Sequence, residues 1–453
     1  MFKHIGKMLA VGGVAVGLIA AYAPPSYASA RPAVTGPVLA QVGSDTTYWV
    51  MAGSDANPNI GQTLPAKPTK GLSDLWNAHA KVNGVALNPG NSSVVEVTPF
   101  LNAPFSGGSQ TVAGDSDCPG GTTYNGGNIP PGGSGAGQTA LKNDATGGSP
   151  GCIDFSRSSA AATVDPNMEA FAYGIDGLDW VTFPGNVHKV TNLTPATIQS
   201  IYTCNPSTHI PFVRFWDQIP GGVGHVQIVK YAPQVKSGTY SFFKSKYLGG
   251  NEADTGCAGG PSLSTFTQEH DATGAAAPAD CPSLPGVQPG DTSIGRPGAI
   301  DAGASSCVET STIANAIDVF SSAQWTAQHT GVLNDLRGGT KLQKVNGLAP
   351  TATTLNESPN RFFGSRYVYN ILYNHAKTGA GGSEPQYAAT LAFAGVDGSG
   401  PGYICGYYVN RLGKTIGNAA STIKKFGFVP LPLGDSGTGL PVSMCRKDPN
   451  PAL

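Results

Sequence analysis

Short apolar runs alternate along this chain with amphipathic segments that begin just after Ser, Thr or Gly. Residues 37–51 predict a strand that ends near Gly43, then a polar turn, then the start of a helix. Residues 93–100 alternate between apolar and polar positions as a second strand does, and residues 151–159 predict a short strand followed by a hydroxyl-rich turn. Strands that alternate with helices predict an α/β fold with mixed, mostly parallel sheets flanked by helices.

The same pattern continues through the rest of the chain. Residues 193–203 predict a helix with Thr194 as its N-cap and Pro195 in the first helical position. Ser237 and Thr239 open another helix after a strand. The remaining elements that we expect are two strand-like pieces within 170–183, a helix over 312–328, a strand over 366–374, and a helix with an apolar tail over 420–434.

The first thirty residues have the layout of a secretory signal peptide. Lys3 and Lys7 precede an apolar run over 8–21, and Ala28-Ser29-Ala30 forms an A-x-A cleavage site. A membrane anchor is the alternative, but the apolar run is short for a span and rich in Gly and Ala. No later stretch is long and apolar enough to span a membrane, and no cysteine closely follows the run. We therefore expect a secreted, soluble product without a lipid anchor.

Eight cysteines follow the signal segment, and an even number in an exported chain favours disulfides. No CxxC pair or Cys/His spacing is present, which argues against a zinc site. The pairing remains open at this point. The local bridges that we favour are Cys118–Cys152, Cys281–Cys307 and Cys405–Cys445.

Charge is sparse and balanced. Charged residues make up 12% of the chain and leave a net charge of −1, so bulk electrostatics do not favour nucleic acid or an anionic membrane as a partner. Hydrophobic residues, at 40%, are enough to build a core. A chain of 453 residues predicts two lobes or domains rather than one.

Three strand-to-helix junctions share one design, with Ser, Thr or Gly at the start of the helix: 44–47, 133–137 and 237–239. Free backbone amides at a helix N-terminus attract anions, and neighbouring hydroxyls add donors. One such junction is usually only a cap, but three of them, with Arg157 after a fourth strand, favour a shared anion site at the carboxyl ends of the strands. The alternative for Arg157 is an ion pair with Asp154 or another carboxylate.

Enzyme motifs fit poorly. Residues 132–136 miss the last glycine of the G-x-S-x-G nucleophile elbow, and His225 and His270 are weak candidates for a triad histidine. The GSGAGQ loop lacks the acidic residue of a dinucleotide site, and no P-loop, HExxH or EF-hand is present. We therefore expect no catalytic activity, no cofactor and no metal, and a secreted serine hydrolase is the least favoured alternative.

Six segments resemble, in order, the extracytoplasmic phosphate-binding proteins of high-affinity phosphate ABC transporters: VGSDTT, GSGAGQTALKN, CIDFSRSSA, LTPATIQSIYTCNPSTHIPFVRFWDQIPGG, KSGTYSFFKSKYL and FGFVPLPL. The resemblance runs from about residue 40 to 435, with inserts near 105–130 and 250–307. It implies a two-lobed type II periplasmic-binding-protein fold that closes on an anion. The first lobe would comprise 31–183 and 361–453, and the second 184–360, with the 250–307 insert held by disulfides.

Two positions depart from the family pattern. Where the family has an aspartate that accepts the proton of hydrogen phosphate, this chain has Ser159, and where it has a ligand-clamping arginine, this chain has Pro233. Lys236 and Arg157 are the cations left to replace that arginine. Loss of the acid removes a repulsion, so the resemblance implies weaker discrimination between phosphate and sulfate, or a shift to another oxyanion such as a phosphonate or carboxylate.

The sequence therefore predicts a secreted, non-catalytic and monomeric solute-binding protein that captures phosphate or a related small oxyanion for an ABC permease. The alternative is an extracellular interaction protein that keeps the two lobes without transport. The predicted ligand-binding residues are Ser44, Asp45, Thr46, Thr47, Ser134, Gly135, Arg157, Ser158, Ser159, Lys236, Ser237, Gly238 and Thr239.

Overall fold

The fold is that of a computed structural model, in which described residues begin at Val38 and end at Lys447. The described residues fall in the ranges 38–55, 64–78, 81–86, 92–99, 109–161, 165–253, 264–265, 313–374, 384–409, 415–431 and 446–447, several of which contain short gaps. The predicted signal segment and almost all of the insert after residue 253 lie outside them.

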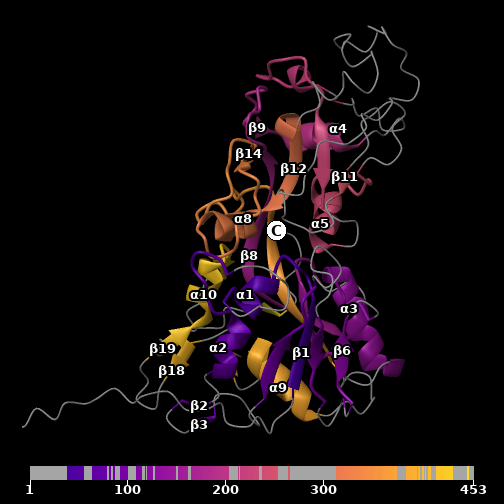
Figure 1. Ribbon diagram of the computed structural model, residues 1–453, viewed down its shortest axis with the longest axis vertical. Helices are drawn as coiled ribbons and strands as arrows, with labels where there is room; N and C mark the ends of the chain where they lie inside the picture. Colours follow the sequence, from indigo (N-terminus) through magenta and orange to yellow (C-terminus); the bar gives the residue numbers. More distant parts are fainter. Residues whose placement is uncertain are drawn as a thin grey trace, which may run out of the picture. The chain divides into compact units, whose positions relative to one another are not determined.

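One mixed sheet of eleven strands runs through the described part of the chain (Figure 1). Its main path has the order β11-β10-β12-β8-β15-β7-β1-β4, and three further strands pair with β8 outside this path. The path comprises β11 (Ser264–Thr265), β10 (Val229–Ala232), β12 (Ala316–Ser321), β8 (Met168–Thr182), β15 (Ser365–Tyr373), β7 (Phe155–Ser158), β1 (Val38–Gly43) and β4 (Ser93–Glu96), and the added strands are β13 (Lys341–Leu342), β20 (Val429–Pro430) and β21 (Arg446–Lys447).

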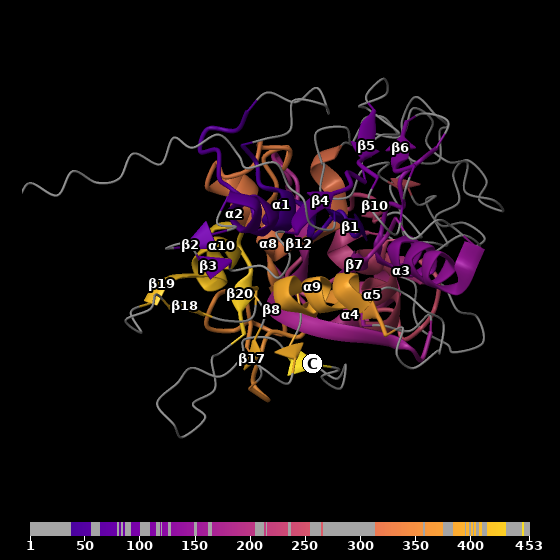
Figure 2. The same cartoon turned by 90° about the horizontal axis from the view of Figure 1, so that it is seen from below.

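The sheet contains two groups of parallel strands that are joined through two long antiparallel strands. β4, β1 and β7 run parallel to one another, as do β11, β10 and β12. Between the groups, β8 pairs with β15 over residues 168–177 and with β12 over residues 178–182. β8, the long strand labelled in Figure 2, is buried along its whole length. The predicted α/β class is confirmed, with parallel strands in each group and antiparallel strands linking them.

Helices and pairs of short strands complete the described structure. The helices are α1 (Tyr48–Ala52), α2 (Leu72–Ala78), α3 (Ser134–Asn143), α4 (Pro195–Tyr202), α5 (Gly238–Lys246), α8 (Ser322–His329), α9 (Glu384–Ala394) and α10 (Ala419–Lys425), with single turns at Asp144–Gly148, Trp216–Gln218 and Ile313–Asn315. The paired short strands are β2 (Lys81–Val82) with β3 (Val85–Ala86), β5 (Gln110–Val112) with β6 (Thr122–Tyr124), β9 (Asn192–Leu193) with β14 (Lys344–Val345), β16 (Val396–Asp397) with β17 (Gly400–Pro401), and β18 (Tyr407–Val409) with β19 (Thr415–Asn418).

Two large apolar clusters stabilise the two parts of the sheet. One combines side chains of α4 and α5 with β8, and includes Trp180 and Trp216 with ring centroids 6.3 Å apart. The other combines α1, α2, α9 and α10 with β1 and β15, and in it Trp76 meets Phe393 edge-on. A helix that covers a sheet must bury its apolar stripe there, so these clusters fix which helix lies on which part of the sheet.

Local capping signals identify helix starts correctly. The Thr194 hydroxyl accepts a hydrogen bond from the Thr197 amide at 3.0 Å, with Pro195 in the first turn. The Ser237 hydroxyl accepts from the Tyr240 amide at 2.9 Å. Each cap satisfies a backbone donor that has no acceptor within its own helix, which explains why these helices begin where the sequence indicates.

Two predicted elements are wrong. Residues 170–183 do not form two strands, because β8 is one continuous strand of 15 residues. Residues 312–328 are not one helix, since Ala316–Ser321 is a strand and the helix begins only at Ser322. The β-branched and aromatic residues of AIDVF favour the interior of a sheet, and the Ser321 side chain caps the helix by accepting from the Gln324 amide at 3.2 Å.

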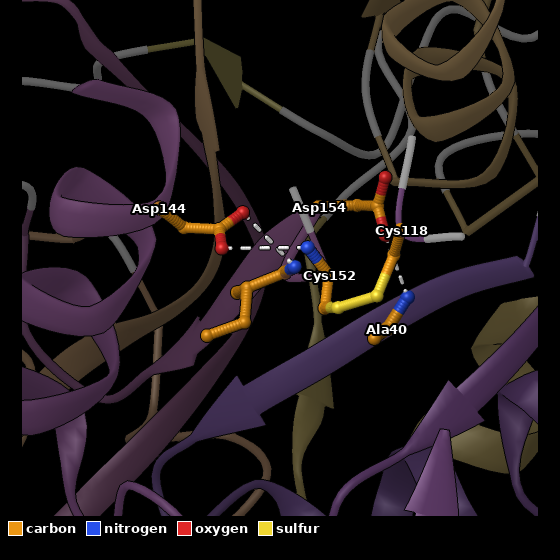
Figure 3. Close-up of a disulfide and its surroundings, with 6 residues drawn as sticks. Ala40, Cys118, Asp144, Cys152 and Asp154 are labelled. Atoms are coloured by element: carbon orange, nitrogen blue, oxygen red, sulfur yellow. Dashed lines mark hydrogen bonds between the residues drawn. A yellow bond between two sulfur atoms is a disulfide. The ribbon is translucent and has the colours of Figure 1, made fainter. Parts of the chain in front are cut away.

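A disulfide between Cys118 and Cys152, one of the predicted local bridges, joins the first insert to the segment before β7 (Figure 3). Nearby, Asp144 accepts hydrogen bonds from the Cys152 and Ile153 amides at 3.3 and 3.1 Å, and Asp154 accepts from the Ala40 amide at 2.8 Å. The other six cysteines lie outside the described residues, so their pairing stays a prediction.

None of the described helices is long and apolar enough to cross a membrane.

The Cys118–Cys152 bridge closes a loop with a sequence separation of 34 residues. A cross-link of that span restricts the unfolded chain by about 3–4 kcal/mol on the chain-entropy account. We therefore expect the double substitution Cys118→Ala/Cys152→Ala to lower the free energy of unfolding in urea by about that amount. A double variant as stable as the unsubstituted protein would show that the bridge does not constrain the unfolded chain.

Candidate functional site

The first predicted junction follows β1. Ser44, Thr46 and Thr47 are fully buried, and the Ser44 amide donates to the Arg157 carbonyl at 3.1 Å. This loop leads into α1, and Asp45 accepts a hydrogen bond from the Thr46 amide at 3.0 Å. The loop is thus held at the carboxyl end of β1, as the sequence predicts.

The second junction, at the start of α3, lies against the end of β7. The Ser159 amide donates to the Ser134 hydroxyl at 2.9 Å, and the two hydroxyl oxygens are 3.3 Å apart. This packing depends on Gly137, because a Cβ there would lie 2.5 Å from the Cα of Gly43 in β1. The glycine therefore lets the first turn of α3 approach the strand.

The third junction, at the start of α5, meets the other two. A Cβ on Gly238 would lie 2.1 Å from the Ser134 hydroxyl oxygen and 2.6 Å from that of Ser159, so only glycine allows this approach. The next residue, Thr239, has its hydroxyl oxygen 3.0 Å from that of Thr46. The three junctions and the end of β7 therefore come together at the start of α5.

We call Thr46, Ser134, Ser159 and Thr239 the hydroxyl cluster. Its four side chains are almost completely buried and come from four separate segments of the chain. α3 and α5 begin within it, so backbone amides of two helix N-termini lie beside the hydroxyls. Uncharged hydroxyls and helix N-termini together can donate several hydrogen bonds to an anion without the repulsion of a carboxylate among the four.

Other predicted site residues lie differently. The Ser158 hydroxyl donates to the Ala160 carbonyl at 2.5 Å and accepts from the Gln138 side chain of α3 at 3.2 Å, so it is engaged by the turn after β7 and by α3. Gly135 is exposed. Ser237 is engaged as the cap of α5, and Pro233 is buried just after β10. Lys236 lies outside the described residues.

The guanidinium of Arg157 binds acceptors of the protein itself. It donates to the Glu96 carboxylate at 2.6 Å and to the backbone carbonyls of Gln41, Ser44 and Val97 at 2.9, 3.3 and 2.8 Å. Arg157 is completely buried, and its guanidinium lies 5.1 Å from the centre of the Tyr48 ring. These contacts argue against an oxyanion role and correspond to the carboxylate alternative, with Glu96 in place of Asp154.

Arg157 instead holds the first loop in place. Its side chain binds carbonyls on both sides of the β1 end, at Gln41 and Ser44, and its own carbonyl accepts from the Ser44 amide. The loop that carries Thr46 is thereby fixed from β7. Arg157 is a positioning residue for the hydroxyl cluster.

Glu96, the partner of Arg157, is buried on β4 and also accepts a hydrogen bond from Ser73. Burial raises the pKa of the Glu96 carboxyl, although the positive charge of Arg157 and the bond from Ser73 act in the opposite direction. A buried carboxylate that has lost its hydration is thus tolerated here because a guanidinium compensates for it.

A second buried arginine, which the sequence reasoning missed, contacts the hydroxyl cluster. Arg366 on β15 donates from Nη2 to the Thr239 hydroxyl at 2.9 Å. Its Nε and Nη2 also donate to one oxygen of Asp176 on β8, at 3.1 and 2.8 Å. The available signal was the single charged residue, Arg366, in the otherwise uncharged strand SRYVYNILY.

Gln324, at the start of α8, also reaches the first loop, because its side-chain amide donates to the Thr46 carbonyl. This contact links α8 with the segment after β1. A glutamine in an amphipathic helix has no distinctive sequence signal, so the contact was not predicted.

The residues considered for a hydrolase or a metal site can be followed only in part. His225, a weak triad candidate, pairs with Asp217 at 2.7 Å and stacks on Phe215, and within the described residues its other ring nitrogen has no hydrogen-bond partner. His270 lies outside those residues. No group of three or more His, Cys, Asp or Glu side chains in the described ranges is arranged to hold a metal ion.

Comparison with known proteins finds similarity among solved structures. No protein-family model matches this chain, and no curated protein does. Solved structures do show similarity, among them an ABC-type phosphate transport receptor from Vibrio cholerae (14% identity, 86% of this chain and 99% of that one, TM-score 0.43). A putative phosphate ABC transporter substrate-binding protein with bound phosphate, from Clostridium perfringens, is 12% identical over 87% of this chain and 99% of that one, with a TM-score of 0.42.

PstS from Borrelia burgdorferi is similar at 13% identity, over 87% of this chain and 98% of that one, with a TM-score of 0.37. The structures found in this way are thus of the kind that the sequence resembles. At these identities and TM-scores the similarity assigns no ligand, and the site has to be argued from its own residues.

Substitution of Arg157 tests its role in the buried ion pair. We expect Arg157→Met to lower the free energy of unfolding by about 3–5 kcal/mol at pH 8, because Glu96 is left buried and unpaired. The loss should be smaller at pH 5. The positive charge of Arg157 opposes the effect of burial on Glu96, so its removal should raise the pKa of Glu96 further. Protonation of Glu96 then removes the unpaired charge at low pH, and this relief is lost as the pH rises through the raised pKa.

Urea unfolding at both pH values measures this effect, with Glu96→Gln/Arg157→Met as the control. The double variant carries no ionisable group at this pair, so its loss should be similar at the two pH values. An equal loss for Arg157→Met at pH 5 and pH 8 would contradict the assigned pairing.

Proposed function

We propose that this chain is a secreted, non-catalytic solute-binding protein that captures phosphate or a closely related small oxyanion at the hydroxyl cluster. The observation that carries the proposal is the convergence of Thr46, Ser134, Ser159 and Thr239 at the N-termini of α3 and α5. Buried hydroxyls on separate segments have little structural reason to gather at two helix starts. An anion gives them one, because each hydroxyl and each free amide can donate to it.

The hydrogen bonds that the hydroxyls now make with one another would be exchanged for bonds to the ligand. Thr46 follows β1, in one parallel group of strands, whereas Thr239 follows β10, in the other. We propose that the two groups act as two lobes, the first comprising 31–183 and 361–453 and the second 184–360. A ligand between Thr46 and Thr239 would then bind both lobes at once.

The proposed cellular role follows from the predicted signal segment and from the resemblance to the phosphate transport family. A monomeric binding protein outside the cytoplasm would deliver its ligand to an ABC permease. The solved structures with which this chain shows similarity include phosphate-binding proteins of such transporters, in line with this role.

Affinity in the micromolar range is within reach of such a site. It requires about −8 kcal/mol, and hydrogen bonds to a charged group contribute about 1.5–3 kcal/mol each. Five or six donors, from hydroxyls and amides with one cation, are sufficient after the entropy of binding is subtracted.

Selectivity between phosphate and sulfate should be weak. The position at which the family has its proton-accepting aspartate is Ser159, whose hydroxyl lies 3.3 Å from that of Ser134. A hydroxyl can donate to either anion and repels neither of them, unlike a carboxylate. The site should therefore bind the fully ionised sulfate about as well as hydrogen phosphate.

Thermal melting of the ligand-stripped mature protein tests the function. Phosphate at about 100 times its dissociation constant should add about 2.7 kcal/mol of stability and raise the melting temperature by a few degrees. Sulfate should give a shift of similar size, and small carboxylates and phosphonates complete the series. If no anion raises the melting temperature, the proposal is wrong and the alternative of an extracellular interaction protein with the same fold is favoured.

Substitution of Ser159 by an acid tests the origin of the selectivity. We expect Ser159→Asp to weaken sulfate binding at least about 10-fold relative to phosphate, because a carboxylate repels sulfate but can accept the proton of hydrogen phosphate. Calorimetric titration with both anions measures the ratio, and Ser159→Ala, which adds no charge, is the control. An unchanged ratio in Ser159→Asp would show that residue 159 does not face the ligand.

A further inference from the structure

Arg366 presents one satisfied edge and one edge on which a single nitrogen, Nη1, has no partner among the described residues. A guanidinium has a side edge formed by Nε and Nη2 and an end edge formed by Nη1 and Nη2. The side edge of Arg366 donates to Asp176, and on the end edge Nη2 donates to the Thr239 hydroxyl. Within the described part of the chain, Nη1 has no hydrogen-bond partner, although Arg366 is only 2% exposed.

An open edge on a buried guanidinium is costly, because its N–H donors have lost their water without gaining an acceptor. Proteins tolerate such donors where a ligand completes them. Here the open Nη1 lies beside an Nη2 that already contacts the hydroxyl cluster. The end edge therefore combines a free donor, Nη1, with an Nη2 that a ligand would share with Thr239, and a fork of this kind matches the spacing of two oxygens on a tetrahedral or planar oxyanion.

We propose that Arg366 is the cation that binds the oxyanion, through the end edge that it shares with Thr239. The inference rests on the proposed function of the hydroxyl cluster, and it assigns the charge that the cluster itself lacks. Arg366 takes this role from β15, a strand 127 residues beyond Thr239 in the chain. The ligand class is a small oxyanion that offers at least two oxygens on one side.

Asp176 holds this arginine in position. One of its oxygens accepts both bonds from the side edge of Arg366, while the other accepts from the Ser321 hydroxyl at 2.9 Å and the Ala323 amide at 3.1 Å. The carboxylate is thus fixed by the start of α8. Because Asp176 is tied from both sides, Arg366 is held with its end edge toward Thr239, and little side-chain entropy remains to be lost on binding.

The other positions at which a ligand-binding cation was expected are less suited to this role. Arg157 already donates from all three of its nitrogens to protein acceptors, including Glu96. Pro233, at the position of the family's arginine, has no side-chain donor. Arg366 is the buried guanidinium that combines contact with the hydroxyl cluster and an open donor among the residues described.

Calorimetric titration of inorganic phosphate into the full mature protein and three variants tests the assignment. Arg366→Lys keeps the charge beside Asp176 but removes the fork. Asp176→Asn/Arg366→Gln removes both charges together, so that no unpaired charge is left buried. Arg337→Gln is the matched control, because it breaks an arginine–aspartate pair with Asp335 outside the hydroxyl cluster.

We expect Arg366→Lys to weaken phosphate binding by about 10-fold to 100-fold, with a melting temperature close to that of the unsubstituted protein. The double variant should lose binding further, and Arg337→Gln should bind as the unsubstituted protein does. If the double variant does not fold, Arg366→Lys alone decides.

Phosphate affinity within about two-fold of the unsubstituted protein in both Arg366 variants would overturn the assignment and leave the proposed function intact. If the unsubstituted protein itself binds neither phosphate nor sulfate, the proposed function fails, and the role of Arg366 fails with it. The two failures are therefore distinguished by the behaviour of the unsubstituted protein.

Discussion

A buried guanidinium needs hydrogen-bond acceptors, and this requirement determines the contacts around the candidate site. Burial removes water from its five N–H donors, and each donor without a new acceptor costs free energy. Among the described residues, two such groups are buried beside carboxylates, Arg157 with Glu96 and Arg366 with Asp176. The two pairs differ in the remaining donors of the arginine: those of Arg157 go to backbone carbonyls, whereas Nη1 of Arg366 has no partner among the described residues.

The first pair is closed. Arg157 binds Glu96 and three backbone carbonyls, and these contacts join β1, β4 and β7 at their carboxyl ends. The pair thereby fixes the loop that carries Thr46. The second pair is open on one side, because Asp176 satisfies the side edge of Arg366 and leaves the end edge beside Thr239. Rigid support on one side and unused donors on the other characterise a preorganised binding site.

The helix starts were predictable from the sequence because they depend on residues that are close together in the chain. The start of α4 after Thr194 and the start of α5 after Ser237 depend on caps within four residues, so a reading of the chain finds them. The strand β15 follows from its alternating pattern. By contrast, the strand Ala316–Ser321 lies in a segment predicted to be a helix. Its apolar run of six residues is too short for periodicity to distinguish a strand from a helix.

The candidate site was predictable only in part, because its geometry depends on strand register. The partner of Arg157 is Glu96, since β1 pairs Gln41 with Glu96 on one side and Gly43 with Arg157 on the other, which brings the two side chains across one intervening strand. Spacing along the chain does not encode that register. Arg366 was missed for the same reason, since it reaches Thr239 only through the pairing of β15 with β8.

A crystal structure of the mature protein with phosphate tests the central claim most directly. The account predicts one phosphate among the hydroxyl cluster residues, with one oxygen within hydrogen-bond distance of Nη1 of Arg366 and others near the hydroxyls of Thr46, Ser134 and Thr239. Arg157 should remain on Glu96. Phosphate bound elsewhere, or a hydroxyl cluster that keeps its internal hydrogen bonds at saturating phosphate, would contradict it.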